Sequence, residues 1–82
     1  MALLISVAPA GEGWAVRSDA LATDLLFDRG GRAEAAARRI ADHYADAGRP
    51  AEVRVFLRDG ALAGRYLHPS SPASAPRLEM AS

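Results

Sequence analysis

Short runs of alternating apolar and polar residues lie on either side of one longer helical pattern in this 82-residue chain. Residues 3–8 are apolar and β-branched, and residues 14–19 alternate large apolar with small or polar side chains, so both segments are predicted strands. Trp14 and Val16 are expected on the inner face of the second strand, and Arg17 on its outer face. Trp14 is therefore predicted to anchor the core.

Residues 32–47 have the spacing of an amphipathic helix. The predicted apolar stripe consists of Ala33, Ala36, Ala37, Ile40, Tyr44 and Ala47. Because most of these residues are alanine, Ile40 and Tyr44 are expected to insert most deeply. Gly48 suits the left-handed position just past a helix end, and Pro50 cannot continue the helix.

Residues 51–58 and 61–67 are two further predicted strands, joined by a hairpin at Asp59-Gly60. A two-residue turn with positive φ at both positions sets the register. It pairs Val53 with Tyr66, Val55 with Gly64 and Leu57 with Leu62 on the inner face, and Arg54 with Arg65 and Phe56 with Ala63 on the outer face. The two opposing arginines would repel each other unless an anion or an acidic side chain lies between them.

The predicted fold class is α+β: an antiparallel sheet of four to five strands, ββ(β)αββ, with one helix packed on one face. The optional strand is residues 23–27, irregular or at an edge. Residues 1–68 form the single predicted domain. Residues 69–82 are rich in Pro, Ser and Ala without periodicity and are predicted to be a disordered tail.

The composition narrows the classes of function. Ten arginines and no lysine balance ten acidic residues, which argues against nucleic-acid or membrane binding driven by net charge. Nineteen alanines leave large apolar residues for only one thin core, and the absence of cysteine excludes disulfides and thiol chemistry. No segment resembles a signal peptide or approaches the ~18 apolar residues of a membrane span, so the expected location is the cytoplasm.

Three motifs resemble a small bacterial domain family of unknown function: Gly-Trp-Ala-Val at 13–16, the Ala-rich helix from 32 to 39, and Arg-Asp-Gly at 58–60. That family runs as a strand, a Gly-Gly-Trp-x-Val strand, an Ala-rich helix and an Arg-Asp-Gly hairpin. The resemblance covers residues 5–67 and implies a fold but no activity. This chain departs from the pattern at Glu12, where the family usually has glycine, and in the more apolar segment 19–29, which is expected to be an extra strand or a partner surface.

No residue set indicates catalysis or cofactor binding. His43 and His68 lie in no motif, and three or four converging ligands for a metal are not evident. The serines lack an identifiable base, and no phosphate-binding loop signature is present. The sequence therefore predicts a protein that is not an enzyme, with no catalytic, metal or cofactor residues and no small-molecule substrate.

One candidate binding face remains, on the outer side of the predicted sheet. It consists of Arg17, Arg54, Phe56, Arg58 and Arg65. Such a face is an ordinary solvated surface, a contact with a protein partner or a second copy, or a platform on which single-stranded nucleic acid stacks. Stacking contributes roughly 1–3 kcal/mol per base, so one phenylalanine would bind weakly. The predicted function is a small interaction module that self-associates or binds protein, with weak nucleic-acid binding as the alternative.

Overall fold

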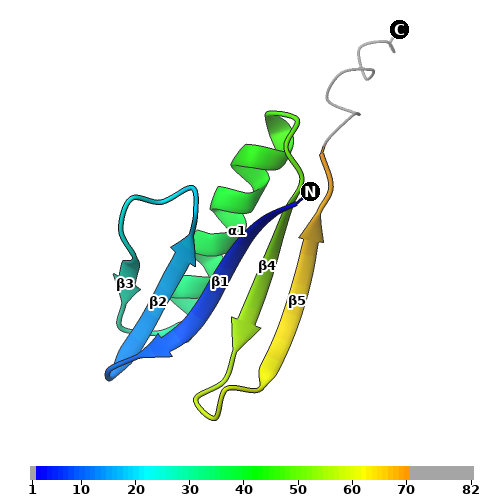
Figure 1. Ribbon diagram of the computed structural model, residues 1–82. Helices are drawn as coiled ribbons and strands as arrows, with labels where there is room; N and C mark the ends of the chain where they lie inside the picture. Colours follow the sequence, from blue (N-terminus) through cyan, green and yellow to red (C-terminus); the bar gives the residue numbers. More distant parts are fainter. Residues whose placement is uncertain (1, 71–82) are drawn as a thin grey trace, which may run out of the picture.

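A computed structural model describes residues 2–70, in which one helix packs on a five-stranded sheet (Figure 1). The elements are β1 (Leu3–Ala10), β2 (Gly13–Ser18), β3 (Leu25–Phe27), α1 (Gly30–Asp46), β4 (Ala51–Phe56) and β5 (Leu62–His68). This is the predicted α+β fold, with the optional strand present as the short edge strand β3. The predicted tail lies outside the described residues from position 71 onward.

The sheet is mixed rather than fully antiparallel, which corrects the prediction. Its strand order is β3-β2-β1-β4-β5, and β1 and β4 run parallel while every other neighbouring pair is antiparallel. The reason is the connection: α1 crosses the sheet and returns the chain to the end at which β1 starts, as parallel pairing requires. The Leu3 amide accordingly donates to the Pro50 carbonyl oxygen at 2.9 Å.

The core lies between α1 and alternate residues of the central strands. The sheet residues of the core cluster are Leu3, Ile5, Val7, Val16, Ala51 and Val53. On the helix the buried residues are Ala33, Ala37, Ala41 and Ala45, which recur every four positions. Ala33 and Ala37 belong to the predicted stripe and are confirmed as buried. Because alanines let the helix approach the sheet closely, Ile40 and Tyr44 lie partly buried at its sides instead of inserting deeply.

The start of α1 lies against Trp14. A Cβ added at Gly30 would be 3.0 to 3.3 Å from three atoms of the indole, so the absence of a side chain there allows the close approach. Trp14 itself is partly buried and packs on the core, in agreement with its predicted role as an anchor. The helix ends at Asp46, and Gly48 has the predicted positive φ, +95°.

The hairpin between β4 and β5 differs from the predicted two-residue turn. Gly60 has a positive φ of +90°, but Asp59 does not, because every described residue with positive φ is a glycine. The Leu57 amide donates to the Ala61 carbonyl oxygen at 2.8 Å, so the loop has three residues, 58–60. The Asp59 carboxylate accepts the Ala61 amide at 2.9 Å and braces the loop.

A β-bulge then restores the predicted register further along the strands. The longer loop shifts the pairing by one residue, so Phe56 lies opposite Leu62 rather than Ala63, and Leu57 does not pair with Leu62. The bulge beside Phe56 shifts it back. The predicted pairs Val53–Tyr66, Arg54–Arg65 and Val55–Gly64 are therefore confirmed.

Candidate functional site

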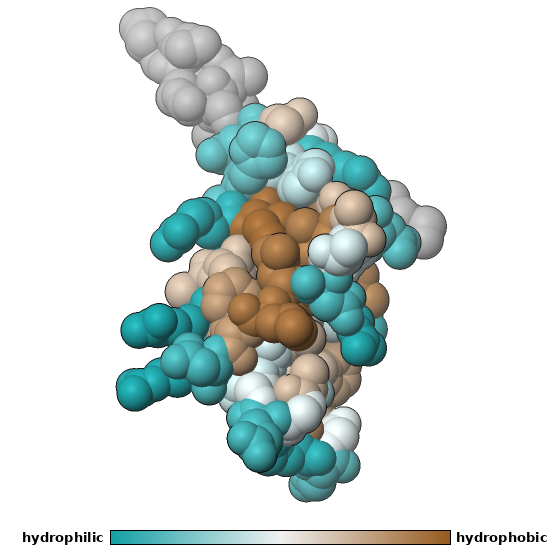
Figure 2. Space-filling model, turned by 90° about the vertical axis from the view of Figure 1, so that its left-hand side faces the viewer, coloured by the Kyte–Doolittle hydropathy of each residue, from teal (hydrophilic) through white to brown (hydrophobic). Residues whose placement is uncertain are grey.

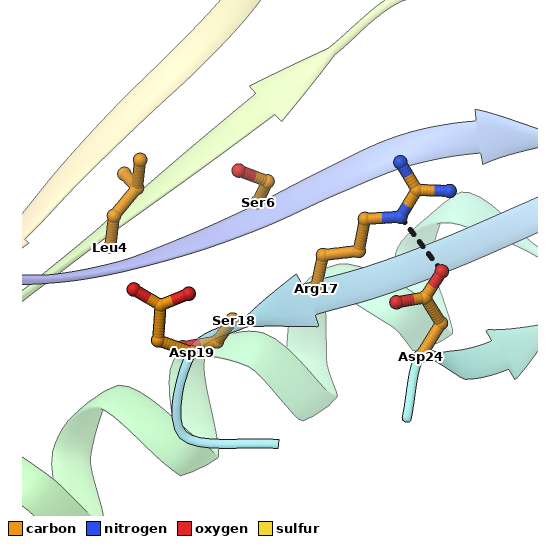
Figure 3. Close-up of a pocket in the computed structure, with 6 residues that line it drawn as sticks. All are labelled: Leu4, Ser6, Arg17, Ser18, Asp19 and Asp24. Atoms are coloured by element: carbon orange, nitrogen blue, oxygen red, sulfur yellow. Dashed lines mark hydrogen bonds and ion pairs between the residues drawn. The ribbon is translucent and has the colours of Figure 1, made fainter. Parts of the chain in front are cut away.

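Within residues 2–70 no helix covers the second face of the sheet, because α1 packs on the other face alone (Figure 1). We call the uncovered side the outer face and describe it as rows that run across the strands. The arginine row is Arg17, Ser6, Arg54 and Arg65, and the leucine–carboxylate row beside it is Asp19, Leu4, Glu52 and Leu67. Asp19 lies in the turn that follows Ser18, the last residue of β2, where the Leu21 amide donates to the Ser18 carbonyl oxygen at 3.0 Å. We count it with the second row because it lines the same hollow as Leu4 (Figure 3).

Glu52 bridges the two arginines that face each other across β4 and β5. Its Oε2 accepts hydrogen bonds from Nε of Arg54 and Nε of Arg65, each at 2.7 Å, and its side chain is 11% exposed. The hydrogen bond from Arg54 is the main reason that the pKa of Glu52 lies below its ordinary value of 4.5. Burial opposes this lowering, and the hydrogen bond from Arg65 adds to it.

Arg17 has its own carboxylate partner. Its Nε donates to Oδ2 of Asp24 at 2.7 Å, and Asp24 immediately precedes β3. In both this pair and the Glu52 cluster, the arginines use Nε, and their terminal nitrogens form no hydrogen bond with residues 2–70. These terminal groups are therefore the donors that the outer face can offer to a ligand.

The structure brings together four of the five predicted face residues and separates the fifth. Arg17, Arg54 and Arg65 share the arginine row, and Phe56 follows two positions after Arg54 on the same strand. Arg58 instead lies in the β4–β5 loop, with its terminal nitrogens 3.4 Å from the carbonyl oxygens of residues 11 and 12. Its guanidinium carbon is 5.6 Å from the centre of the Trp14 ring.

An open hollow of about 350 Å³ lies on the outer face between the two rows (Figure 3). Its lining residues are Leu4, Ser6, Arg17, Ser18, Asp19 and Asp24. Asp19 makes no ion pair with any residue of the described part of the chain. The hollow therefore combines an exposed carboxylate, a small hydroxyl side chain at Ser6 and the apolar side of Leu4.

Several leucines outside the five predicted face residues are exposed, and two of them, Leu25 and Leu26, lie in the segment 19–29 that the sequence predicts to be an extra strand or a partner surface. Leu67 is 65% exposed and Leu4 41% exposed, both in the leucine–carboxylate row. At the β3 edge Leu26 is 73% exposed beside Leu25, and Figure 2 shows an apolar band there, flanked by hydrophilic side chains. Their signal in the sequence is the strand alternation, which places Leu4 on the face opposite to the buried Leu3 and Ile5.

Each of the two histidines contacts one side chain of α1. His68 Nδ1 lies 2.7 Å from Oδ1 of Asp42 and ties the end of β5 to α1, a contact that sequence patterns did not predict. The His43 ring meets the edge of Tyr44. Within residues 2–70 no three potential ligands gather on a metal site, and no helix is long and apolar enough to cross a bilayer.

Comparison with protein-family models, curated proteins and solved structures finds no match for this chain. The resemblance to the small bacterial family therefore stays a prediction. In the structure, backbone geometry explains why two residues of the family motifs, Gly13 and Gly60, are glycines. A Cβ at Gly13 would collide with the carbonyl oxygen of Phe27, and Gly60 supplies the positive φ of the hairpin loop.

Proposed function

We propose that this protein is a small non-enzymatic interaction module that associates with a second copy of itself through the outer face. The support begins with the layer arrangement. A sheet with a helix on one face leaves its second face to solvent, where β1 and β5 expose Leu4 and Leu67. Burying these side chains against another sheet removes apolar surface from water, which favours association.

The balance of charge on the outer face carries the proposal. Three cations, Arg17, Arg54 and Arg65, lie among three carboxylates, Asp19, Asp24 and Glu52. A surface with equal numbers of both charges is electrostatically complementary to another copy of itself when the rows are suitably aligned. A surface for the phosphate backbone instead requires an excess of cations.

Weak nucleic-acid binding is the second candidate, and the position of the arginines favours it. Arg17, Arg54 and Arg65 lie in one row with free terminal nitrogens, and Phe56 is nearby for stacking. The carboxylates on the same face repel phosphates, so we rank this function second. As the sequence predicts, we also propose that the protein is located in the cytoplasm.

Analytical ultracentrifugation over a range of protein concentrations tests self-association. We expect a reversible dimer at micromolar protein that weakens strongly in Leu67→Arg, because this variant loses apolar contact and adds a cation beside Arg65 on the same face of β5. Leu57→Arg is the matched control. Leu57 is 47% exposed but precedes the hairpin loop, so this variant should dimerise like the wild type. Circular dichroism melts confirm that both variants are folded.

Two results would overturn the proposal. One is a wild-type protein that remains monomeric at every concentration. The other is equal dimerisation of Leu67→Arg and the wild type. An amide NMR titration with short RNA and DNA at two salt concentrations tests the second candidate, for which salt-sensitive shifts at Arg54, Phe56 and Arg65 are the expected signature.

A further inference from the structure

We infer that the second copy packs face to face about a two-fold axis that runs across the strands between the arginine row and the leucine–carboxylate row. In this arrangement Arg17 of each copy pairs with Asp19 of the other. The inference rests on the proposed self-association and adds its geometry. It follows from strand register, from the free groups in the hollow and from the shape of the two rows.

The register places the two rows side by side. Residues two apart on one face of a strand are separated by roughly 6.7 Å, which is the spacing between neighbouring rows. A two-fold axis midway between the rows exchanges them, so each row lies over the other row of the second copy. Arg17 then faces Asp19, Arg54 faces Glu52, Ser6 faces Leu4 and Arg65 faces Leu67. Every arginine opposes a carboxylate or an apolar side chain.

Other two-fold axes in the plane of the interface bring like charges together. An axis along β1 would exchange β2 with β4, and would therefore set Arg17 over Arg54 and Asp19 over Glu52. An axis along the arginine row would set each arginine over the same residue of the second copy. Like-charge contacts of this kind suppress the wrong arrangement.

The hollow has free groups of the required kinds. Asp19 has no ion-pair partner among the described residues, and Arg17 bonds Asp24 through Nε alone, which leaves its terminal nitrogens for a second carboxylate. Figure 3 shows Arg17 and Asp19 at opposite ends of the hollow, on the same side of the sheet. A reciprocal pair of Arg17–Asp19 contacts between the two copies would give the Asp19 carboxylate and the Arg17 terminal nitrogens a partner of opposite charge.

Shape agrees with charge along the central strand. Ser6 is small and lines the hollow, whereas Leu4 is 41% exposed. Under the proposed axis, Leu4 of the second copy lies over Ser6, and a leucine side chain fits a hollow of about 350 Å³. The large side chain of one row thus meets the small side chain of the other.

The outer face is small, so the dimer is expected to be weak. Four strand positions at ~4.8 Å spacing and two rows at ~6.7 Å span roughly 19 by 13 Å, or about 250 Å² in projection. Standard interfaces bury about 800 Å² per partner, and smaller ones belong to transient complexes. We therefore expect a dissociation constant in the micromolar range.

Two single charge reversals test the axis. Asp19→Arg sets two arginines against each other at both symmetry-related contacts, and Arg17→Asp sets two aspartates against each other in the same way. Each variant alone should dimerise at least about tenfold more weakly than the wild type. Mixed together, they should form a heterodimer, because both contacts then join an arginine to an aspartate. Asp46→Arg, at the exposed end of α1, is the control and should dimerise normally.

The mixing result separates this inference from the proposed function. If the wild type dimerises but Asp19→Arg dimerises equally well, or if the mixed variants fail to associate while each is folded by circular dichroism, the axis is wrong and self-association stands. If the wild type itself is monomeric, the proposed function fails. Recovery in the mixture is not expected from a purely structural role of Asp19 or Arg17.

Discussion

Gly30 and Gly31 open the same helix, yet replacing each with alanine is expected to change stability in opposite directions. Neither glycine has positive φ, so alanine suits the backbone at both positions. A Cβ at Gly31 would meet no atom within 4 Å. A Cβ at Gly30 would lie 3.0 Å from Cε2, 3.1 Å from Cζ2 and 3.3 Å from Nε1 of Trp14.

These contacts determine how much each substitution should change the free energy of unfolding. At Gly31 the reduced entropy of the unfolded chain and the better helix propensity should stabilise the fold by about 0.5 kcal/mol, toward the low end of the usual range because the residue lies in the first turn. The same gain applies at Gly30. There it is outweighed by the displacement of Trp14, since overpacking costs typically 1–3 kcal/mol. The expected net loss for Gly30→Ala is therefore about 0.5–2.5 kcal/mol.

Thermal and urea denaturation of the two variants measures the difference. In a domain of this size 1 kcal/mol corresponds to roughly 4–8 °C in Tm, so Gly31→Ala should melt about 2–4 °C above the wild type and Gly30→Ala below it. Trp14 is the only tryptophan, so its fluorescence reports the displacement directly. A shifted emission maximum is expected for Gly30→Ala and an unchanged one for Gly31→Ala.

A double-mutant cycle with Trp14→Phe identifies the cause. Phenylalanine lacks the indole atoms nearest to Gly30, so in that background Gly30→Ala should lose its penalty and act like Gly31→Ala. Equal Tm shifts for the two alanine variants in the wild-type background would refute the reasoning. So would a penalty at Gly30 that persists without the tryptophan.

Three further changes have defined outcomes. The pKa of Glu52 is lowered in the folded state, so its stabilisation is present above the ordinary value of 4.5 and is lost as pH falls through the lower folded pKa. The Tm of the wild type should therefore fall more steeply with decreasing pH than the Tm of Glu52→Gln. Parallel curves of Tm against pH would contradict this. Gly13→Ala should force Phe27 away and abolish amide-exchange protection in β3 but not in β4, whereas intact β3 protection would argue against the close contact. Asp59→Ala removes the bond to the Ala61 amide and should cost about 0.5–1 kcal/mol in urea denaturation, with no change expected if the loop needs no brace.

Strand alternation was enough to predict which residues lie on each side of the sheet. Val53 and Arg54 lie on opposite faces because successive strand residues must, and this holds whatever the loop geometry. The position of Arg58 depends on that geometry. A three-residue loop moves Arg58 out of the strand, and no local pattern distinguished this loop from the two-residue turn that Asp59-Gly60 also favours.

The partners of the arginines depend on contacts that local sequence does not encode. Glu52 reaches Arg65 across a strand pair, and Asp24 reaches Arg17 through the turn that leads to β3. The parallel pairing of β1 and β4 is likewise fixed by where α1 ends on the sheet. The sequence predicted the need for an acidic side chain between Arg54 and Arg65, but no sequence pattern selected Glu52, which precedes Arg54 by two residues on the same face of β4.

The same register gives the two carboxylates of the leucine–carboxylate row different roles. Glu52 is largely buried beneath two guanidinium groups and already satisfied within one copy, so a second copy adds little to it. Asp19 has no such partner among the described residues. Replacing Glu52 should therefore reduce the stability of the monomer more than its association, and replacing Asp19 should do the reverse. The specificity of the proposed dimer then rests on the Arg17–Asp19 contact, although Arg54 and Glu52 lie in the same two rows.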